Sequence, residues 1–256
     1  MDCKRIVVKV GTSTLTHDTG KTNIRQMKKL VSVLADIVNS GVEVALVSSG
    51  SIGVGAGKLG IEDRPSDTAS KQALSTVGQC ELMFMYDKMF NEYSHTIGQI
   101  LVTKRDLEND ESKENLINSF EKLFEYGAVP IVNENDAIAI DEIVFGDNDA
   151  LSAIIARFIG ADKLIILTDI DGLYDKDPSD KDAELIPEVN VITESLYEIA
   201  GGRGSKFGTG GMVTKLQAAE IAMEAGIEMV VTTGEKPSNI YKVLEGKPVG
   251  TKFIKK

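Results

Sequence analysis

The chain has 256 residues and a formal net charge of −11, from 39 acidic and 28 basic residues. This acidic balance argues against nucleic acid or an anionic membrane as a general partner, because either would be repelled. The sequence lacks an apolar run of about 18 residues and a signal-peptide pattern, and its two cysteines have neither metal-ligand nor CxxC spacing, so we expect a cytoplasmic protein with reduced thiols.

Strand-like apolar runs alternate with helical patterns along the chain. The predicted strands are residues 6–10, 42–47, 97–102, 128–132, 163–167 and 229–232. Most of them lack strict apolar and polar alternation, as expected for parallel strands that are covered on both faces. The predicted helices are residues 24–39, 69–90, 113–126 and 148–159, and another helical pattern begins near Met212. The alternation predicts an α/β fold in which helices cover both faces of a mainly parallel sheet.

Two features bear on the organisation of the chain. Residues 137–145 are interpreted as a small hairpin that turns at Asp141 and Glu142. A new strand pattern begins just after Gly160, which makes a lobe boundary plausible there. No flexible linker marks that boundary, so we expect the two lobes to share one sheet.

The most informative stretch is residues 208–215, which read Gly-Thr-Gly-Gly-Met-Val-Thr-Lys. Glycines let a backbone approach a ligand closely, and a helix N-terminus provides N–H groups and a positive dipole end for an anion. These features suit a nucleotide phosphate. The stretch is not a Walker A loop, because Lys215 follows Thr214 instead of a glycine. An ordinary glycine-rich turn before a surface helix is the alternative.

Two further motifs follow predicted strands, where ligands bind in open α/β sheets. Lys9 lies at the end of the first strand and Gly11 follows it, so the lysine would bring positive charge to the sheet edge, although a solvated lysine is the simpler alternative. Residues 48–57 are rich in serine and glycine and are interpreted as a loop with N–H groups exposed to an anion. Residues 55–60 match GxGxxG, but the preceding strand ends too early for a dinucleotide fingerprint.

Short acidic and amide side chains form two clusters, residues 133–136 and residues 146–149. Two Asx turns and a helix N-cap would explain them. Because the clusters flank the predicted hairpin, they also suit a polar pocket for a ligand that carries an ammonium or hydroxyl group. Residues 168–174 follow another strand, and they would form either a tight turn or a contact with the base or ribose of a nucleotide.

Taken together and in this order, the motifs resemble those of the amino-acid kinase family over the whole chain. The residues that carry the resemblance are 8–13, 47–50, 69–72, 132–136, 146–149, 167–169, 172–174 and 208–215. The family fold is a three-layer αβα sandwich around a mainly parallel sheet, as in carbamate kinase. The resemblance implies a single domain over residues 1–256, with an acceptor-binding lobe at 1–160 and an ATP-binding lobe at 161–256.

Within the family, the paired motifs at 133–136 and 146–149 favour members that use L-glutamate over those that use aspartate, acetylglutamate, carbamate or nucleoside monophosphates. The implied reaction converts ATP and L-glutamate to L-glutamyl 5-phosphate and ADP, the first step of proline biosynthesis, with Mg²⁺ on the ATP. The resemblance also implies feedback inhibition by L-proline, a glutamyl-phosphate reductase as the downstream enzyme and a homo-oligomer. Since the chain ends at Lys256, it is similar to members without a C-terminal RNA-binding-like (PUA) domain.

The resemblance assigns roles residue by residue. The catalytic residues are Lys9, Lys215 and Asp149, with Asp149 organising the two lysines. The residues implied for binding glutamate are Ser49, Gly50, Asn133, Asp136 and Asn148. The residues implied for binding ATP are Lys9, Thr168, Asp169, Thr209, Gly210, Gly211, Met212, Val213, Thr214 and Lys215.

Three other classes of protein are compatible with parts of the sequence. Another acyl or phosphoryl kinase of the same fold is the nearest. A dinucleotide-dependent oxidoreductase has only the GxGxxG match at residues 55–60 in its favour. A non-catalytic ligand sensor on the kinase fold is disfavoured, because Lys9, Lys215 and Asp149 are all present.

Overall fold

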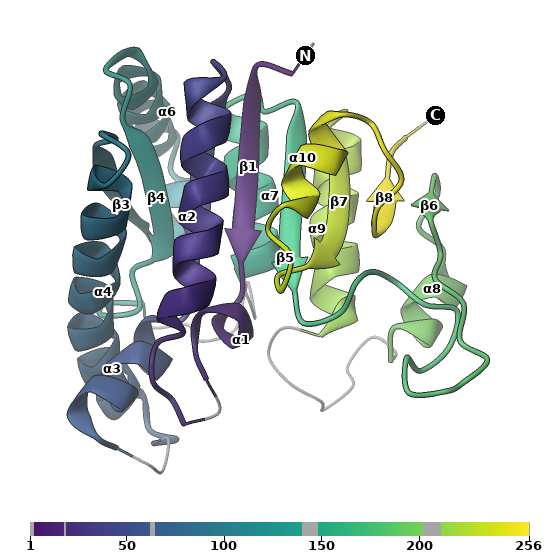
Figure 1. Ribbon diagram of the computed structural model, residues 1–256, viewed down its shortest axis with the longest axis horizontal. Helices are drawn as coiled ribbons and strands as arrows, with labels where there is room; N and C mark the ends of the chain where they lie inside the picture. The colour runs from purple at the N-terminus through teal and green to yellow at the C-terminus, as the bar shows by residue number, and fades with distance from the viewer. Residues whose placement is uncertain (1–2, 18, 62–64, 140–147, 202–210, 256) are drawn as a thin grey trace.

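The computed structural model describes residues 3–17, 19–61, 65–139, 148–201 and 211–255. Within these ranges the strands form one sheet of eight, in the order β3-β4-β2-β1-β5-β7-β8-β6 (Figure 1). The strands are β1 (Arg5–Val10), β2 (Glu43–Ser48), β3 (Ile97–Val102), β4 (Val129–Glu134), β5 (Lys163–Thr168), β6 (Glu188–Val189), β7 (Glu228–Thr233) and β8 (Thr251–Phe253).

The centre of the sheet is parallel. Strand β1 pairs with β2 on one side and with β5 on the other, so the first strand of the chain joins its two halves. Strands β4 and β3 extend the sheet in parallel beyond β2, and β7 extends it beyond β5. Among the described pairs, only β7 with β8 is antiparallel. The central strands are buried on both faces, which is why their sequences are continuous apolar runs.

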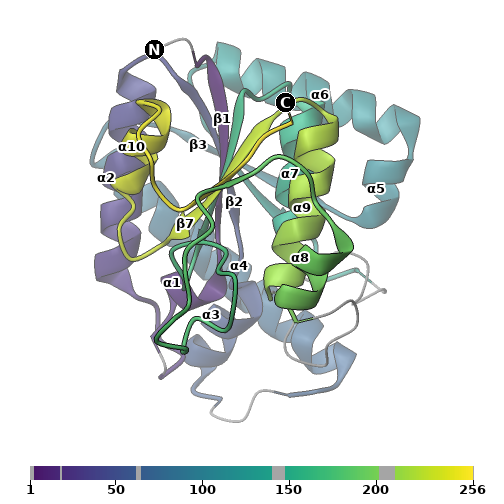
Figure 2. The same cartoon turned by 90° about the vertical axis from the view of Figure 1, so that its right-hand side faces the viewer.

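Helices cover both faces of the sheet, as Figure 2 shows along its edge. The helices are α1 (Thr12–Leu15), α2 (Ile24–Asn39), α3 (Ser51–Leu59), α4 (Thr68–Asn91), α5 (Lys104–Glu108), α6 (Asp110–Glu125), α7 (Asn148–Phe158), α8 (Glu194–Ile199), α9 (Met212–Glu224) and α10 (Asn239–Leu244). One core cluster packs α6, α7 and α9 against the sheet, and the other packs α2, α4 and α10 against the opposite face. The predicted three-layer αβα sandwich is therefore confirmed.

The long elements lie close to their predicted positions. Helix α2 has the predicted bounds, and each predicted strand lies within two residues of an observed one. Helix α6 begins at Asp110, three residues earlier than predicted, because Asn109 caps it by accepting a hydrogen bond from the backbone N–H of Ser112. Most of the predicted hairpin at 137–145, including its turn, lies outside the described residues. Within the described ranges, none of the helices has the length and apolarity needed to cross a lipid bilayer.

The interpretation of residues 48–57 as a loop is wrong beyond Gly50. Gly50 adopts a left-handed conformation, with φ 100°, and helix α3 begins at the next residue. Glycines in α3 allow very close packing, since a Cβ atom at Gly55 would lie 2.0 Å from the carbonyl oxygen of Leu74 in α4. In return, a Cβ atom at Gly78 of α4 would lie 1.7 Å from the carbonyl oxygen of Ser51. Within the GxGxxG match, Gly55 packs against α4, Gly57 packs against the backbone of Gly20, and Gly60 ends α3 in a left-handed conformation, so the match is not a dinucleotide fingerprint.

Candidate active site

The candidate site lies at the carboxyl edge of the parallel strands, where ligands bind in open α/β sheets. In Figure 1 the arrow of β1 points toward this edge, and helices α1 and α3 lie below it. Strands β1, β2, β4 and β5 bring Lys9, Ser48, Asn133 and Thr168 to this edge. Their parallel registers therefore gather motifs that are far apart in the sequence.

A buried cluster of charges occupies the centre of this edge. The Lys9 Nζ atom lies 2.6 Å from Asp149 Oδ1, and the Lys215 Nζ atom lies 3.1 Å from Asp149 Oδ2. The exposed fractions are only 1% for Lys9, 3% for Lys215 and 0% for Asp149. One buried carboxylate thus holds two buried ammonium groups.

Local structure explains why these three side chains meet. Lys9 belongs to β1, Asp149 to the first turn of α7 and Lys215 to the first turn of α9. The positive end of the helix dipole favours a carboxylate in the first turn, whereas it disfavours a lysine there. Asp149 offsets that cost for Lys215. The hydroxyl of Thr214 adds a hydrogen bond of 2.9 Å to Asp149 Oδ2.

The ionisation of Asp149 follows from this arrangement. Burial opposes the charged form of its carboxyl group, but the neighbouring ammonium groups of Lys9 and Lys215 outweigh burial. The pKa of Asp149 therefore lies below its ordinary value. At neutral pH the residue is an ionised holder of two lysines, and it is not suited to deliver a proton.

Gly11 leaves space beside this cluster. A Cβ atom at position 11 would lie 3.8 Å from Lys9 Nζ and 3.9 Å from Ser13 Oγ. Any larger side chain at this position would therefore fill the space next to the Lys9 ammonium group. Glycine keeps that approach open for a ligand.

A second cluster, built of amides, lies beside the charged one. The Asn148 Nδ2 group donates to Asn133 Oδ1 at 2.8 Å, to Ser49 Oγ at 3.1 Å and to the Ser48 carbonyl oxygen at 3.3 Å. Asn133 in turn donates from Nδ2 to Gln79 Oε1 at 2.9 Å. Asn148, Asn133 and Ser49 are buried. Their hydrogen bonds fix the orientation of both amides at the ends of β2 and β4.

Two carboxyl groups lie at the end of β4, beside this amide cluster: Glu134 is the last residue of the strand, and Asp136 follows it. Asp136 accepts a hydrogen bond of 2.6 Å from Ser51 Oγ, which ties it to the start of α3. Burial raises the pKa of Asp136, although the Ser51 hydrogen bond opposes the shift. Burial and the nearby charge of Asp136 raise the pKa of Glu134 to about 7. The two carboxyl groups give this part of the site affinity for a cation.

The residues predicted to bind a nucleotide lie on the other side of Lys9, at the ends of β5 and in the first turn of α9. Thr168 donates from Oγ1 to Asp169 Oδ1 at 2.9 Å, and its carbonyl oxygen accepts from the Gly234 N–H at 2.6 Å. Gly211 is the N-cap of α9, and Met212, Val213, Thr214 and Lys215 form its first turn. The predicted residues Thr209 and Gly210 lie outside the described residues.

The structure therefore brings Lys9, Asp149 and Lys215 together in a charged group, and Ser49, Asn133 and Asn148 in a group built of amides. The predicted residues Asp136, Thr168 and Asp169 lie at the same edge but outside these two groups. Sequence reasoning missed Gln79 and Ser51, which contact Asn133 and Asp136 directly. It also missed Tyr86, whose hydroxyl lies 2.9 Å from Ser48 Oγ. No local signal marks Gln79 or Tyr86, because each lies inside a long helix whose pattern only predicts packing.

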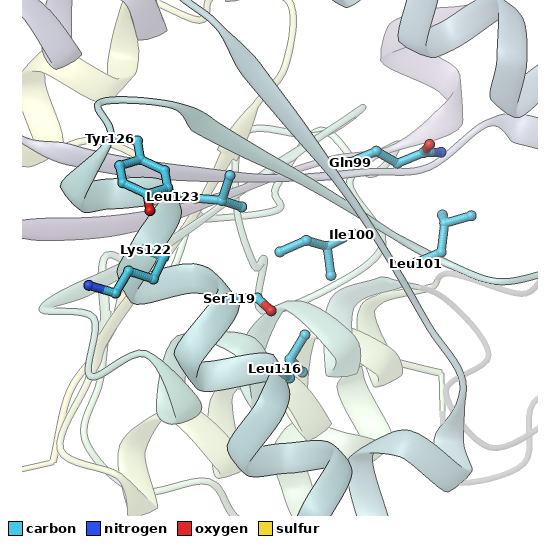
Figure 3. Close-up of a pocket in the computed structure, with 8 residues that line it drawn as sticks. All are labelled: Gln99, Ile100, Leu101, Leu116, Ser119, Lys122, Leu123 and Tyr126. Carbon is cyan, nitrogen blue, oxygen red and sulfur yellow. The ribbon is translucent and has the colours of Figure 1, made fainter.

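A hollow lies elsewhere, between β3 and α6 (Figure 3). It has a volume of about 480 Å³ and includes Leu101, Leu116, Leu123 and Tyr126 in its lining. The ammonium group of Lys122 at its margin pairs with Glu125 at 2.5 Å. Its lining lacks the convergent charged groups of the carboxyl edge, so this hollow is not the candidate active site.

A metal ion would have few protein ligands available in the parts of the chain that the structure describes. There, no three side chains of His, Cys, Asp or Glu gather as a metal site. Both carboxylate oxygens of Asp149 already face lysine ammonium groups. This carboxylate is thus better suited to organise cations of the protein than to bind a divalent ion.

Comparisons with known proteins agree with this arrangement. The profile of the amino acid kinase family matches residues 4–233. The chain is 54% identical to a glutamate 5-kinase of Clostridium perfringens over an alignment of 260 residues. The alignment covers 100% of this chain and 97% of the relative. It is also 49% identical to a glutamate 5-kinase of Listeria innocua over an alignment of 258 residues. This alignment covers 99% of this chain and 94% of the relative.

Solved structures share the architecture at much lower identity. The carbamate kinase from Giardia lamblia bound to AMP-PNP has a TM-score of 0.72 at 16% identity, covering 100% of this chain and 99% of that chain. An isopentenyl phosphate kinase from T. acidophilum has a TM-score of 0.65 at 18% identity, covering 97% of this chain and 99% of that chain. At such identities the likeness shows a common fold.

Proposed function

Since the chain belongs to the amino acid kinase family, we propose that it transfers the γ-phosphoryl group of ATP to the γ-carboxylate of L-glutamate. The products are L-glutamyl 5-phosphate and ADP, and the reaction is the first step of L-proline biosynthesis. The observation that carries the proposal is the pair of buried ammonium groups, Lys9 and Lys215, held by Asp149 where the strands end. The identity to glutamate 5-kinases over the whole chain supports glutamate as the acceptor.

Phosphoryl transfer depends on positioning and on stabilisation of charge. The γ-carboxylate of glutamate is already ionised at neutral pH, so the reaction needs no general base. Its approach to a polyphosphate brings negative charges together. Lys9 and Lys215 offset this repulsion and stabilise the charge that develops on the transferred group, because they act in a site with little water. Asp149 keeps the two ammonium groups in place.

The amide cluster binds the acceptor in this proposal. Its member Asn148 directly precedes Asp149, the partner of Lys9, and its polar groups can contact both ends of an amino acid. Asp136 is best suited to the α-ammonium group, because it supplies a carboxylate close to the start of α3. The residues assigned to glutamate are Ser49, Gly50, Asn133, Asp136 and Asn148.

The C-terminal half binds the nucleotide in this proposal. The residues assigned to ATP are Lys9, Thr168, Asp169, Thr209, Gly210, Gly211, Met212, Val213, Thr214 and Lys215. The N-terminus of α9 offers backbone N–H groups and a positive dipole end to phosphate oxygens. Mg²⁺ accompanies ATP and neutralises part of the phosphate charge, which suits an ion that binds mainly substrate phosphates and water.

Four further points extend the proposal beyond the reaction. L-proline acts as a feedback inhibitor at a site that overlaps the glutamate pocket. A glutamyl-phosphate reductase consumes the product, since acyl phosphates hydrolyse or cyclise readily. The protein works in the cytoplasm, and it forms a homo-oligomer. These points rest on the family resemblance, and the measurement of proline inhibition is the most direct of their tests.

A hydroxamate assay for glutamyl phosphate tests the function, with ADP release measured in parallel on a panel of acceptors. We expect hydroxamate only when L-glutamate and ATP are both present, and less of it when L-proline is added. Glutamate-independent ADP release, or a clear preference for another acceptor, would refute the proposed substrate. Binding of NAD(P) in a titration would instead favour an oxidoreductase.

The proposed role of Lys215 has its own test. We expect Lys215→Ala to lower kcat by about 10²–10³, the usual effect of removing one group that stabilises charge in the transition state. Lys242→Ala, at an exposed position in α10, is the matched control and should leave kcat unchanged. Near-normal turnover by the Lys215 variant would remove this lysine from the catalytic group.

A further inference from the structure

Helix α4 carries a polar stripe that faces the carboxyl edge of the sheet. The stripe consists of Gln72, Gln79 and Tyr86, which are seven residues apart and therefore lie on one side of the helix. Each of them hydrogen-bonds to a different segment beside the amide cluster. Gln72 donates to the carbonyl oxygen of Ala139 at 3.3 Å, Gln79 accepts from Asn133 at 2.9 Å, and the Tyr86 hydroxyl lies 2.9 Å from Ser48 Oγ.

Gln79 is the member that acts directly on the amides. Its Oε1 atom accepts from Asn133 Nδ2, so Asn133 must present its oxygen to the opposite side. That oxygen accepts hydrogen bonds from Asn148 Nδ2 at 2.8 Å and from the backbone N–H of Glu134 at 2.9 Å. If Asn133 were turned over, all three hydrogen bonds would be lost. The backbone N–H of Glu134 thus fixes the orientation of the Asn133 amide, and Gln79, by accepting the N–H on the other side, helps to hold Asn133 and its partner Asn148 in place.

The backbone around Gln79 makes this contact rigid. The preceding residue, Gly78, packs against the carbonyl oxygen of Ser51 so tightly that no side chain fits between the helices. Ser51 is the first residue of α3 and follows Gly50. The turn of α4 that carries Gln79 is therefore held at a fixed position relative to Gly50, which places the Gln79 side chain within reach of Asn133.

We propose that Gln79 is a positioning residue for the phosphoryl acceptor, acting through Asn133 and Asn148 without touching the reacting atoms. The inference rests on the proposed function in one respect, because it takes the amide cluster as the acceptor pocket. Gln79 lies on the acceptor side of Lys9, and in the part of the chain that the structure describes its side chain hydrogen-bonds to Asn133. Its loss should accordingly weaken binding of the acceptor and leave ATP binding intact.

The test compares Gln79→Leu with Gln79→Glu. Leucine has a similar volume but no acceptor for the Asn133 N–H, whereas a glutamate carboxylate can still accept it. We expect Gln79→Leu to raise the KM for L-glutamate by about 5- to 50-fold, as expected for a buried donor left unpaired, with the KM for ATP changed less than about twofold. Gln79→Glu should retain much of the affinity that the wild-type protein has for L-glutamate. Gln217→Leu, at an exposed position in α9, is the matched control for the change of side chain.

The outcomes separate this inference from the proposed function. The wild-type protein is first assayed on the acceptor panel, and the acceptor that supports ADP release is used for all variants. An acceptor other than glutamate would refute the proposed substrate, while the KM comparison would still test Gln79. If the wild-type protein uses glutamate and Gln79→Leu leaves its KM unchanged, or raises the KM for ATP equally, the role of Gln79 is refuted.

Discussion

Replacing Asp149 by asparagine tests the central charged cluster most directly. The change keeps the size of the side chain but removes the negative charge that faces Lys9 at 2.6 Å and Lys215 at 3.1 Å. The two ammonium groups would then lose the carboxylate that they share, in a site where neither lysine is more than 3% exposed. Both the stability of the fold and the rate of the reaction should therefore fall.

The size of the effect follows from burial. Removing one partner of a buried ion pair costs about 3–5 kcal/mol, because it leaves an uncompensated charge. For a protein of 256 residues, this loss corresponds to a melting temperature lower by about 6–20 °C. We expect kcat to fall by about 10²–10³, since the lysines lose the group that holds them in place. ATP would supply negative charge near the lysines, so saturating ATP should raise the melting temperature of the variant more than that of the wild type.

Thermal unfolding with and without ATP, together with steady-state kinetics, measures these effects. Asp87→Asn, an exposed position in α4, is the matched control and should change stability by less than about 0.5 kcal/mol. A variant at position 149 with normal stability and normal kcat would refute the reasoning. Loss of stability without loss of kcat would mean that Asp149 supports only the fold.

Three further variants probe other parts of the structure. Asp136→Asn should raise the KM for L-glutamate about 10-fold with little change for ATP, because the amide lacks the charge that pairs with an ammonium group, and a weaker ATP affinity would contradict the assignment. Gly78→Ala should lower the unfolding free energy by at least about 1–3 kcal/mol in denaturant titrations, since its Cβ atom would lie 1.7 Å from the Ser51 carbonyl oxygen. Glu134, with its pKa raised from 4.5 to about 7, stabilises the fold fully below pH 4.5 and loses that contribution as the pH rises toward 7. Glu134→Gln should therefore increase the unfolding free energy at pH 8 by about 1 kcal/mol, a value reduced for solvent screening because the group is only half-buried. Near pH 4 the substitution should have little effect, and an equal effect at both pH values would contradict the pKa assigned to Glu134.

The central strands could be predicted because their burial on both faces leaves a direct mark on the sequence. Strands β1, β2 and β5 are runs of valine, leucine and isoleucine, so their positions follow from composition. Strands β6 and β8 were missed, since two or three residues are too short for a periodic signal. Their pairing depends on distant segments of the chain.

Helix α3 shows where local propensity misleads. Glycines at positions 53, 55 and 57 disfavour a helix in isolation, and they led to the interpretation as a loop. Here Gly55 permits a backbone approach to α4, and Gly57 an approach to the backbone of Gly20, that larger residues would forbid, so packing outweighs propensity. The sequence pattern of one segment cannot reveal the surface of another segment that lies against it.

The candidate site, too, could be predicted from the sequence only in part. Lys9, Asp149 and Lys215 could be proposed from motifs, because Lys9 lies near the end of a strand and the other two lie in the first turns of helices. The fact that one carboxylate contacts both lysines depends on how α7 and α9 pack, and the sequence carries no local sign of it. Gln79 was invisible for a similar reason, since its partner Asn133 lies 54 residues further along the chain.

The position of β1 between β2 and β5 limits how the protein can move. Residues of β1 hydrogen-bond to both neighbours along most of the strand, from Ile6 to Val10. A cut near Gly160 would leave β1 with an open edge on one fragment and β5 with an open edge on the other. The two halves of the sheet cannot rotate as separate bodies without breaking that ladder. Any closure around the substrates must therefore come from segments at the carboxyl edge or from bending of the whole sheet. Lys9 accordingly stays at a fixed distance from β5 during ligand binding and release.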